Sequence, residues 1–270
     1  MGYRRLRNIV IKEWRVIFTD ANSALIVTLL PLLIVGQGLL YIWLAYRFGG
    51  EDLISSGLIQ DALSNLTQAI PSVAELAPRD QLRVLLLSQF SFFLLLVPTM
   101  VAMSFATFSI VEEKLSGSLE PLLATPVRTG ELLLGKALSG AVLALIATWV
   151  CAGVFLAATA AMGWGSLLHL VLGPAWFISL FLITPAVVVL SFLLGVIGSS
   201  RAKDAKSAQN GAVLVVLPVF ALIAVQVTGV VWFGPLGALG VALGIAAVDI
   251  LLLRVAIRLF RRESIVVNWR

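Results

Sequence analysis

Six long apolar runs constrain this chain more than any other feature of its sequence. They cover residues 24–46, 85–110, 137–162, 174–198, 211–232 and 236–257. Each is long enough to cross about 30 Å of hydrocarbon as a helix. Only 12% of the residues are charged, about half the fraction typical of soluble domains, so the bilayer is the solvent that suits this composition. The sequence therefore predicts an all-α polytopic membrane protein with six transmembrane helices in a single transmembrane domain, residues 1–270.

The basic residues indicate how the runs are oriented. Sixteen of the nineteen Lys and Arg residues fall in the N-terminal stretch, in the loops 111–136 and 199–210, and near the end of the chain. The other three, Arg47, Arg79 and Arg83, belong to the segment 47–84, which is predicted to lie outside. By the positive-inside rule, both termini and the segment 111–136 are predicted to be cytoplasmic in a multi-pass protein of the inner (plasma) membrane.

Residues 1–20 mix basic and apolar side chains at helical spacing. Leu6, Val10, Trp14 and Ile17 fall on one face, and five Lys and Arg residues surround them. This pattern predicts an amphipathic helix on the inner leaflet, with its basic side chains toward lipid phosphates. The alternative, the charged start of a signal peptide, is disfavoured because the apolar run comes too late and is too long.

The sequence shows no motif for catalysis or for nucleotide binding. Residues 130–137, GELLLGKA, approach the phosphate-binding pattern GxxxxGK(S/T), but Ala137 offers no hydroxyl to magnesium and the loop is rich in leucine. We expect Lys136 to anchor the third run, with its amine among the headgroups. With one cysteine, Cys151, and one histidine, His169, clusters that hold a metal are nearly excluded. We expect no enzymatic activity and no cofactor in this chain.

Several polar residues inside the apolar runs are candidates for a transport pathway. Each could instead form hydrogen bonds between helices, and the sequence leaves both interpretations open. Asp249, in the sixth run, is a functional candidate because a carboxylate inside a span is costly. The favoured alternative is an aspartate near the interface that pairs with a cytoplasmic basic residue, a few positions from Arg254. The candidate pathway residues are Gln37, Gln89, Thr99 and Gln226.

A charged segment separates the second and third apolar runs. Residues 112–126, EEKLSGSLEPLLATP, carry three carboxylates, one lysine and an apolar patch, and they end at a proline. This pattern predicts a short amphipathic helix at the end of one span and the start of the next. Such an element, with one apolar side and one acidic side, is suited to docking a partner.

This segment resembles the signature region of the ATP-binding-cassette (ABC) type-2 permeases, the membrane subunits of exporters. That family shows the pattern E-K/R-x-x-G-T/S-L-E-x-L-L-x-T-P after the second span. The resemblance extends to the six-span layout and covers essentially the whole chain, and Pro121 is one departure from it. The positions that match are Glu113, Lys114, Gly117, Ser118, Leu119, Glu120, Leu122, Leu123, Thr125 and Pro126.

The resemblance implies an exporter driven by separate ATP-binding subunits, two per complex, which bind ATP and Mg. It also implies a second permease copy, in a homodimer or a heterodimer, within membrane lipid and without nucleic acid. The segment near Ser116–Thr125 would be the coupling helix that contacts the ATPase, and Glu112 and Glu113 are candidates for polar contacts that fix the end of the second span. A possible second cytoplasmic contact comprises Arg201, Lys203, Asp204 and Lys206. The alternatives are an ion-coupled secondary transporter and a membrane scaffold that transports nothing.

Overall fold

The chain is helical throughout the part that the structure describes. The structure is a computed structural model, and it describes residues 2–49, 54–115, 129–200, 217, 219–221, 224–225 and 234–259. These residues contain no strand. The all-α prediction is therefore confirmed for the described residues.

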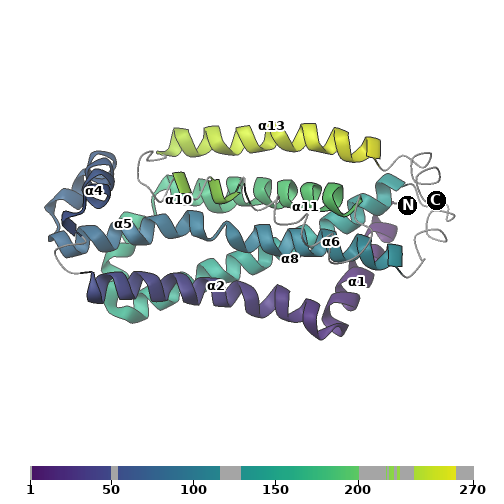
Figure 1. The fold of residues 1–270 in the computed structure, drawn as a ribbon, viewed down its shortest axis with the longest axis horizontal. Coiled ribbons are helices and arrows are strands. Elements are labelled where there is room, and N and C mark those ends of the chain that lie inside the picture. The colour runs from purple at the N-terminus through teal and green to yellow at the C-terminus, as the bar shows by residue number, and fades with distance from the viewer. Residues whose placement is uncertain are drawn as a thin grey trace.

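Within each described range, the helices follow one another with short connections. Several run along the long axis of the molecule, while α1 crosses one end of the bundle and α4 lies at the other end (Figure 1). Two of the elements, η2 and η4, are π-helical. The bounds are α1 Gly2–Thr19, α2 Ala21–Phe48, α4 Gly57–Ala69, η1 Pro71–Glu75, α5 Pro78–Phe93, α6 Leu96–Leu115, α8 Thr129–Thr159, η2 Ala160–Trp164, η3 Gly165–Leu167, α9 Leu168–Val171, α10 Pro174–Ile178, η4 Ser179–Ile183, α11 Thr184–Ser200 and α13 Pro235–Leu259.

Four stretches of the described chain are long and apolar enough to cross a membrane. They are Ser23–Phe48, Gly135–Val171, Pro174–Gly198 and Pro235–Ala256. Of the predicted fifth run, 211–232, only six residues are described, so the count of six spans stays a prediction. The same holds for the membrane-surface position of α1, although residues 2–19 do form a helix.

A capping aspartate separates α1 from the first candidate span. The Asp20 carboxylate accepts hydrogen bonds from the backbone N–H of Ser23 at 2.9 Å and from the Ser23 hydroxyl at 2.6 Å. An N-cap of this kind satisfies donors that the first turn of a helix leaves unpaired. It allows the chain to change direction between α1 and α2.

The second apolar run is divided, where the sequence predicted one continuous span. A turn at Leu94 and Leu95 separates α5 from α6, and Pro98 follows shortly after. Because proline has no N–H, the carbonyl of Leu94 would lose its helical donor. It accepts instead from the backbone N–H of Val97, at 3.1 Å. Within this run, Leu96–Ala106 is an apolar helix too short to span by itself.

A similar adjustment accompanies the proline of the fourth run. The π-helical turn Ser179–Ile183 comes just before Pro185. The carbonyl oxygen of Ser179 accepts from the backbone N–H of Thr184 and also from the Thr184 hydroxyl, the latter at 3.0 Å. Local π-helical geometry and hydroxyl side chains are the means by which membrane helices accommodate proline.

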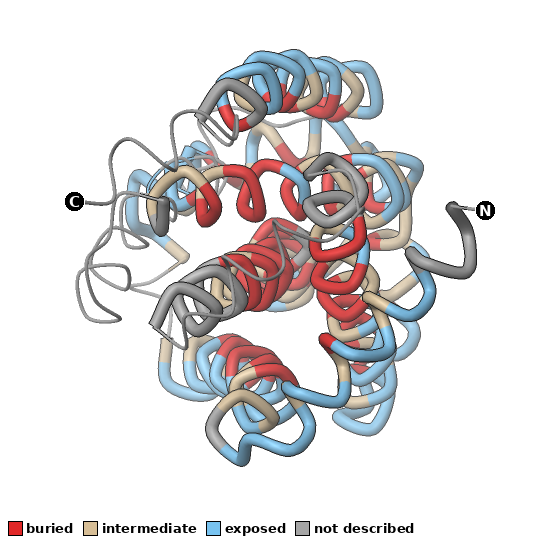
Figure 2. Tube along the Cα trace, turned by 90° about the vertical axis from the view of Figure 1, so that its right-hand side faces the viewer, coloured by how far each residue is buried: buried red, intermediate tan, exposed pale blue. Residues whose placement is uncertain are grey.

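The buried side chains form two hydrophobic cores stacked along the bundle. Buried residues face the middle of the bundle and exposed ones its periphery (Figure 2). The periphery is itself apolar, since Leu236, Leu243 and Ile250 of α13 are exposed. The α4-end core includes Leu66, Val73, Val97, Phe155 and Ile183. The α1-end core includes Val27, Val101, Phe105, Ala144, Val188 and Phe192, with Trp14 and Ile17 of α1 packed against it.

Candidate coupling site and polar interior

Helices α6 and α8 bracket the segment that the sequence assigns to ATPase coupling. The backbone of Glu112, Glu113 and Lys114 belongs to the last turns of α6, and α8 begins at Thr129. The other predicted coupling residues, Gly117, Leu119, Glu120, Leu122, Leu123, Thr125 and Pro126, lie outside the described residues. So do Arg201, Lys203, Asp204 and Lys206, which follow the end of α11. Their roles stay predictions.

A buried ion pair joins α1 to the start of α8. The Lys136 ammonium lies 3.1 Å from a carboxylate oxygen of Glu13, and only 4% and 8% of the two side chains are exposed. Lys12, which is more than half exposed, lies 3.7 Å from the same oxygen. The expectation that Lys136 extends its amine among the headgroups is therefore wrong. The amine of Lys136 faces α1 instead, where the Glu13 carboxylate pairs with it.

Two further contacts fix α1 on the first turns of α8. The indole N–H of Trp14 donates to the backbone carbonyl of Ser139 at 3.1 Å. A Cβ added at Gly135 would lie only 2.8 Å from a methyl carbon of Ile9, so the glycine allows the two helices to approach closely. Together with the ion pair, these contacts attach α1 a few residues after the segment 116–128.

Sequence reasoning overlooked Glu13, although the helical period contains a signal. Ile9, Glu13 and Ile17 are four residues apart, so the carboxylate falls on the less exposed face of α1. A charged residue on that face needs a partner when the face is covered. Its partner is 123 positions away in the chain, and no local pattern identifies it.

The candidate pathway residues do not form one group. Gln37 is on the exposed side of α2, where its amide donates to the hydroxyl of Tyr41 at 2.7 Å. The Thr99 hydroxyl is fully buried and donates to the carbonyl of Leu95 at 2.7 Å. Gln89 is only 8% exposed, and both of its amide atoms lack a hydrogen-bond partner among the described residues. Gln226 lies outside the described part.

Asp249 lies on the inward stripe of α13. The buried positions of this helix are Ala238, Ala242, Ile245, Asp249 and Ala256, spaced by three, four or seven residues. One carboxylate oxygen of Asp249 is buried without a partner in the described chain, and Arg254 is exposed. The favoured interpretation, pairing with a basic residue, is therefore not what the described residues show.

Other unpaired polar atoms are buried on helices that pack against α13. They are the hydroxyl of Ser191 on α11 and the indole nitrogen of Trp176 on α10. Helix α13 contacts α10, η4 and α11, and α5, which carries Gln89, also contacts η4. Buried polar atoms without partners are rare and costly, so a hydrogen bond from a polar solute or a water would stabilise each of them. We call Gln89, Trp176, Ser191 and Asp249 the polar interior.

A comparison with protein families identifies the chain. The model for the family described as "ABC-2 family transporter protein" matches residues 7–244, from α1 into α13. The chain belongs to the ABC-2 transporter family. The resemblance drawn from the signature region is thus confirmed, and the chain is a membrane permease with a role in transport. No curated protein and no solved structure matches it.

The match of this ABC-2 permease includes both features described above. It covers the contact between α1 and α8, and it reaches the part of α13 just before Asp249. Membrane subunits of this family work with ATP-binding-cassette partners. Among the described residues, no three His, Cys, Asp or Glu side chains are grouped so that they could hold a metal ion.

Proposed function

We propose that this ABC-2 permease is the membrane subunit of an ATP-driven exporter, working with two separate ATP-binding subunits and a second permease copy. It would cross the inner membrane six times with both termini in the cytoplasm. The partner subunits would bind ATP and Mg, and this chain would catalyse no reaction itself. The transported solute would pass along the polar interior.

The attachment of α1 to the start of α8 is the observation that supports this proposal most. A coupling helix needs stiff elements on both sides, so that movement of an ATPase displaces spans instead of bending a loop. The segment 116–128 is flanked by α6 and α8, which pack against each other, and α8 is held to α1 by the Glu13–Lys136 pair. A force on the segment would therefore move three helices together.

Asp249 supports one alternative, an ion-coupled secondary transporter. Carriers of that class need a titratable or ion-coordinating group inside the membrane. Asp249 is buried with an unpaired oxygen and meets this requirement. It is the only carboxylate in the polar interior, whereas such carriers more often assemble several ligands around the ion.

Copurification tests the partnership with an ATPase. We would purify the tagged chain from its own host and identify the proteins that elute with it, for wild type and for Glu120→Arg. The matched control is Glu75→Arg, which reverses an exposed charge in η1 near α4. We expect an ATPase with wild type and with the control, and its loss with Glu120→Arg. A dimeric chain without any ATPase would contradict the proposal.

Thiol labelling tests the pathway and its energy source. The single natural cysteine, Cys151, is buried, so a Cys151→Ala background leaves only introduced thiols. Gln89→Cys and Ser191→Cys would be treated with a membrane-impermeant thiol reagent, with Leu243→Cys on the apolar periphery as the control. We expect ATP to change labelling at positions 89 and 191 only. A change produced by an ion gradient instead would favour the secondary transporter.

A further inference from the structure

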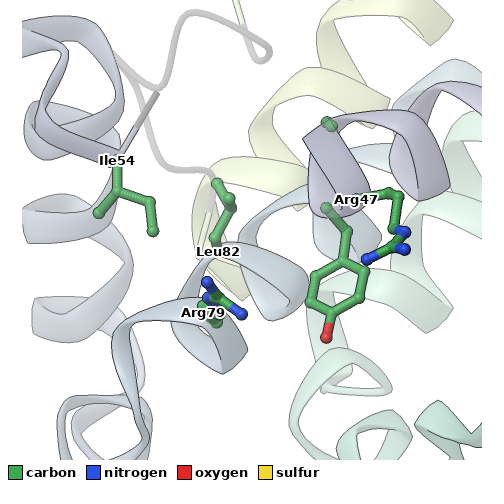
Figure 3. A pocket seen from close by; sticks show the side chains of 6 residues that line it. Arg47, Ile54, Arg79 and Leu82 are labelled. Carbon is green, nitrogen blue, oxygen red and sulfur yellow. The ribbon is translucent and has the colours of Figure 1, made fainter. Parts of the chain in front are cut away.

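A small pocket lies at the end of the molecule opposite α1. It has a volume of about 140 Å³ and is formed where the last turn of α2 meets the first turns of α5. Arg47 and Arg79 lie on opposite sides of it, with Ile54 and Leu82 nearby (Figure 3). Ala45 and Tyr46 complete the lining.

The two arginines of the pocket carry charge that nothing described neutralises. Neither Arg47 nor Arg79 forms an ion pair within the described residues, and both are exposed. The neighbouring carboxylate, Asp80, already accepts a hydrogen bond from Arg83 at 2.6 Å. Among the described residues, the pocket therefore presents two unpaired positive charges.

Arg83, which is paired with Asp80, lies close to the same place. Its guanidinium lies 3.8 Å from the centre of the Tyr46 ring, and Tyr46 lines the pocket. Two of the three basic residues of the segment 47–84 thus line one small cavity, and the third contacts its wall through Tyr46, although the three are spread over 37 positions (47 to 83) of the sequence. A bound anion would offset the unpaired charges of Arg47 and Arg79, which otherwise repel each other.

From this convergence, we propose that the Arg47–Arg79 pocket binds a phosphate group. Guanidinium groups donate paired hydrogen bonds that match phosphate oxygens. A tetrahedral phosphate presents oxygens in several directions and can accept from arginines on opposite sides, which a flat carboxylate does less well. The volume suits one such group and is too small for a drug-sized ligand, whose pockets exceed about 300 Å³.

The phosphate could belong to a lipid headgroup or be free in solution. Arg47 is in the last turn of the candidate span Ser23–Phe48, and a helix that crosses the membrane ends where the headgroups begin. The apolar side chains of Ile54 and Leu82 suit the glycerol portion of a lipid. Binding needs no ATPase, so the test is independent of the function proposed above.

Thermal unfolding of the purified full chain in maltoside micelles tests the site. One arm adds inorganic phosphate, with chloride at equal ionic strength as the reference. The other adds phosphatidylglycerol, with diacylglycerol of the same acyl chains as the reference. The variants are Arg47→Gln and Arg79→Gln. The control is Arg254→Gln, which removes an exposed arginine from α13.

We expect a saturable rise in the unfolding midpoint of wild type and of the control. The apparent Kd should increase at least about tenfold in each pocket variant, since a hydrogen bond to a charged group contributes that much. A response to inorganic phosphate identifies free phosphate as sufficient, and a response to phosphatidylglycerol alone identifies the lipid headgroup. No response in either arm, or equal binding by the pocket variants, would overturn the proposal.

Discussion

The buried pair between Glu13 and Lys136 leads to a quantitative prediction. At 3.1 Å the Coulomb attraction is about 5 kcal/mol with an effective dielectric constant of about 20. Removing one member of such a pair leaves the other buried and uncompensated, which costs about 3–5 kcal/mol. We expect the lower end for Lys136→Met, because Lys12 is near enough to offset part of the Glu13 charge.

The double variant separates the interaction energy of the pair from the effect of each residue by itself. Apolar side chains of similar size often replace a buried ion pair with little loss. We therefore expect Glu13→Leu with Lys136→Met to be close to wild type, whereas each single variant loses about 3 kcal/mol. The coupling energy of the cycle would then be about 6 kcal/mol in magnitude, because the double variant recovers the loss of both single variants.

The assay is unfolding of the micellar protein with increasing SDS, followed by tryptophan fluorescence. Trp14 stands next to Glu13, so the signal includes the release of α1. Arg15→Met is the control, because Arg15 is an exposed basic residue on the same helix and its loss should change stability by less than about 0.5 kcal/mol. A coupling energy below about 0.5 kcal/mol would refute the reasoning, since it would mean that water screens the pair.

Three further predictions concern the interior and are measured in the same unfolding assay. Gly140→Ala should destabilise the protein by about 1–3 kcal/mol, because the added Cβ would lie 2.6 Å from the Phe105 ring. A Cβ added at Gly153, on the same helix, meets nothing within 4 Å, so Gly153→Ala should stabilise the protein by about 0.5–1 kcal/mol. Equal effects would contradict the packing at Phe105. Asp249→Leu should stabilise by about 1–3 kcal/mol, since it removes a buried oxygen without a partner. Gln89→Leu should also stabilise while it impairs transport; a loss of stability in either variant would indicate that water or a second chain satisfies these atoms.

The helices of this fold were predictable from the sequence, but the side of each helix that faces the other helices was not. Long apolar runs become helices in a bilayer, because a helix is the conformation in which a single segment forms all of its own backbone hydrogen bonds. In a soluble protein, the polar side of a helix identifies the face that is exposed to water. In a membrane protein, the lipid and the protein interior are equally apolar, so the sequence does not distinguish the two faces. Gln37 and Gln89 show the difficulty: both are glutamines in apolar runs, yet one is exposed and the other buried.

The candidate site was predictable to a similar extent. The signature string indicated the family from a few residues, because their order is specific. The attachment of α1 could not be predicted, since it depends on the side of α8 to which Lys136 points and on a carboxylate far away in the chain. The break between α5 and α6 was predictable in part, because Pro98 inside the second apolar run marks a kink; the proline acts on a carbonyl four residues before it.

The stacking of the two cores has a mechanical consequence. Two prolines lie where the cores meet, Pro31 between Val27 and Ile34 and Pro98 between Val97 and Val101, and Pro185 lies a few residues before the same level on α11. Each removes a backbone hydrogen bond and makes its helix easier to bend at that level. Bending is therefore concentrated in one plane across the bundle. A torque applied near α1 would tilt one packed block against the other, while α13, whose one proline is its first residue, would stay straight alongside both.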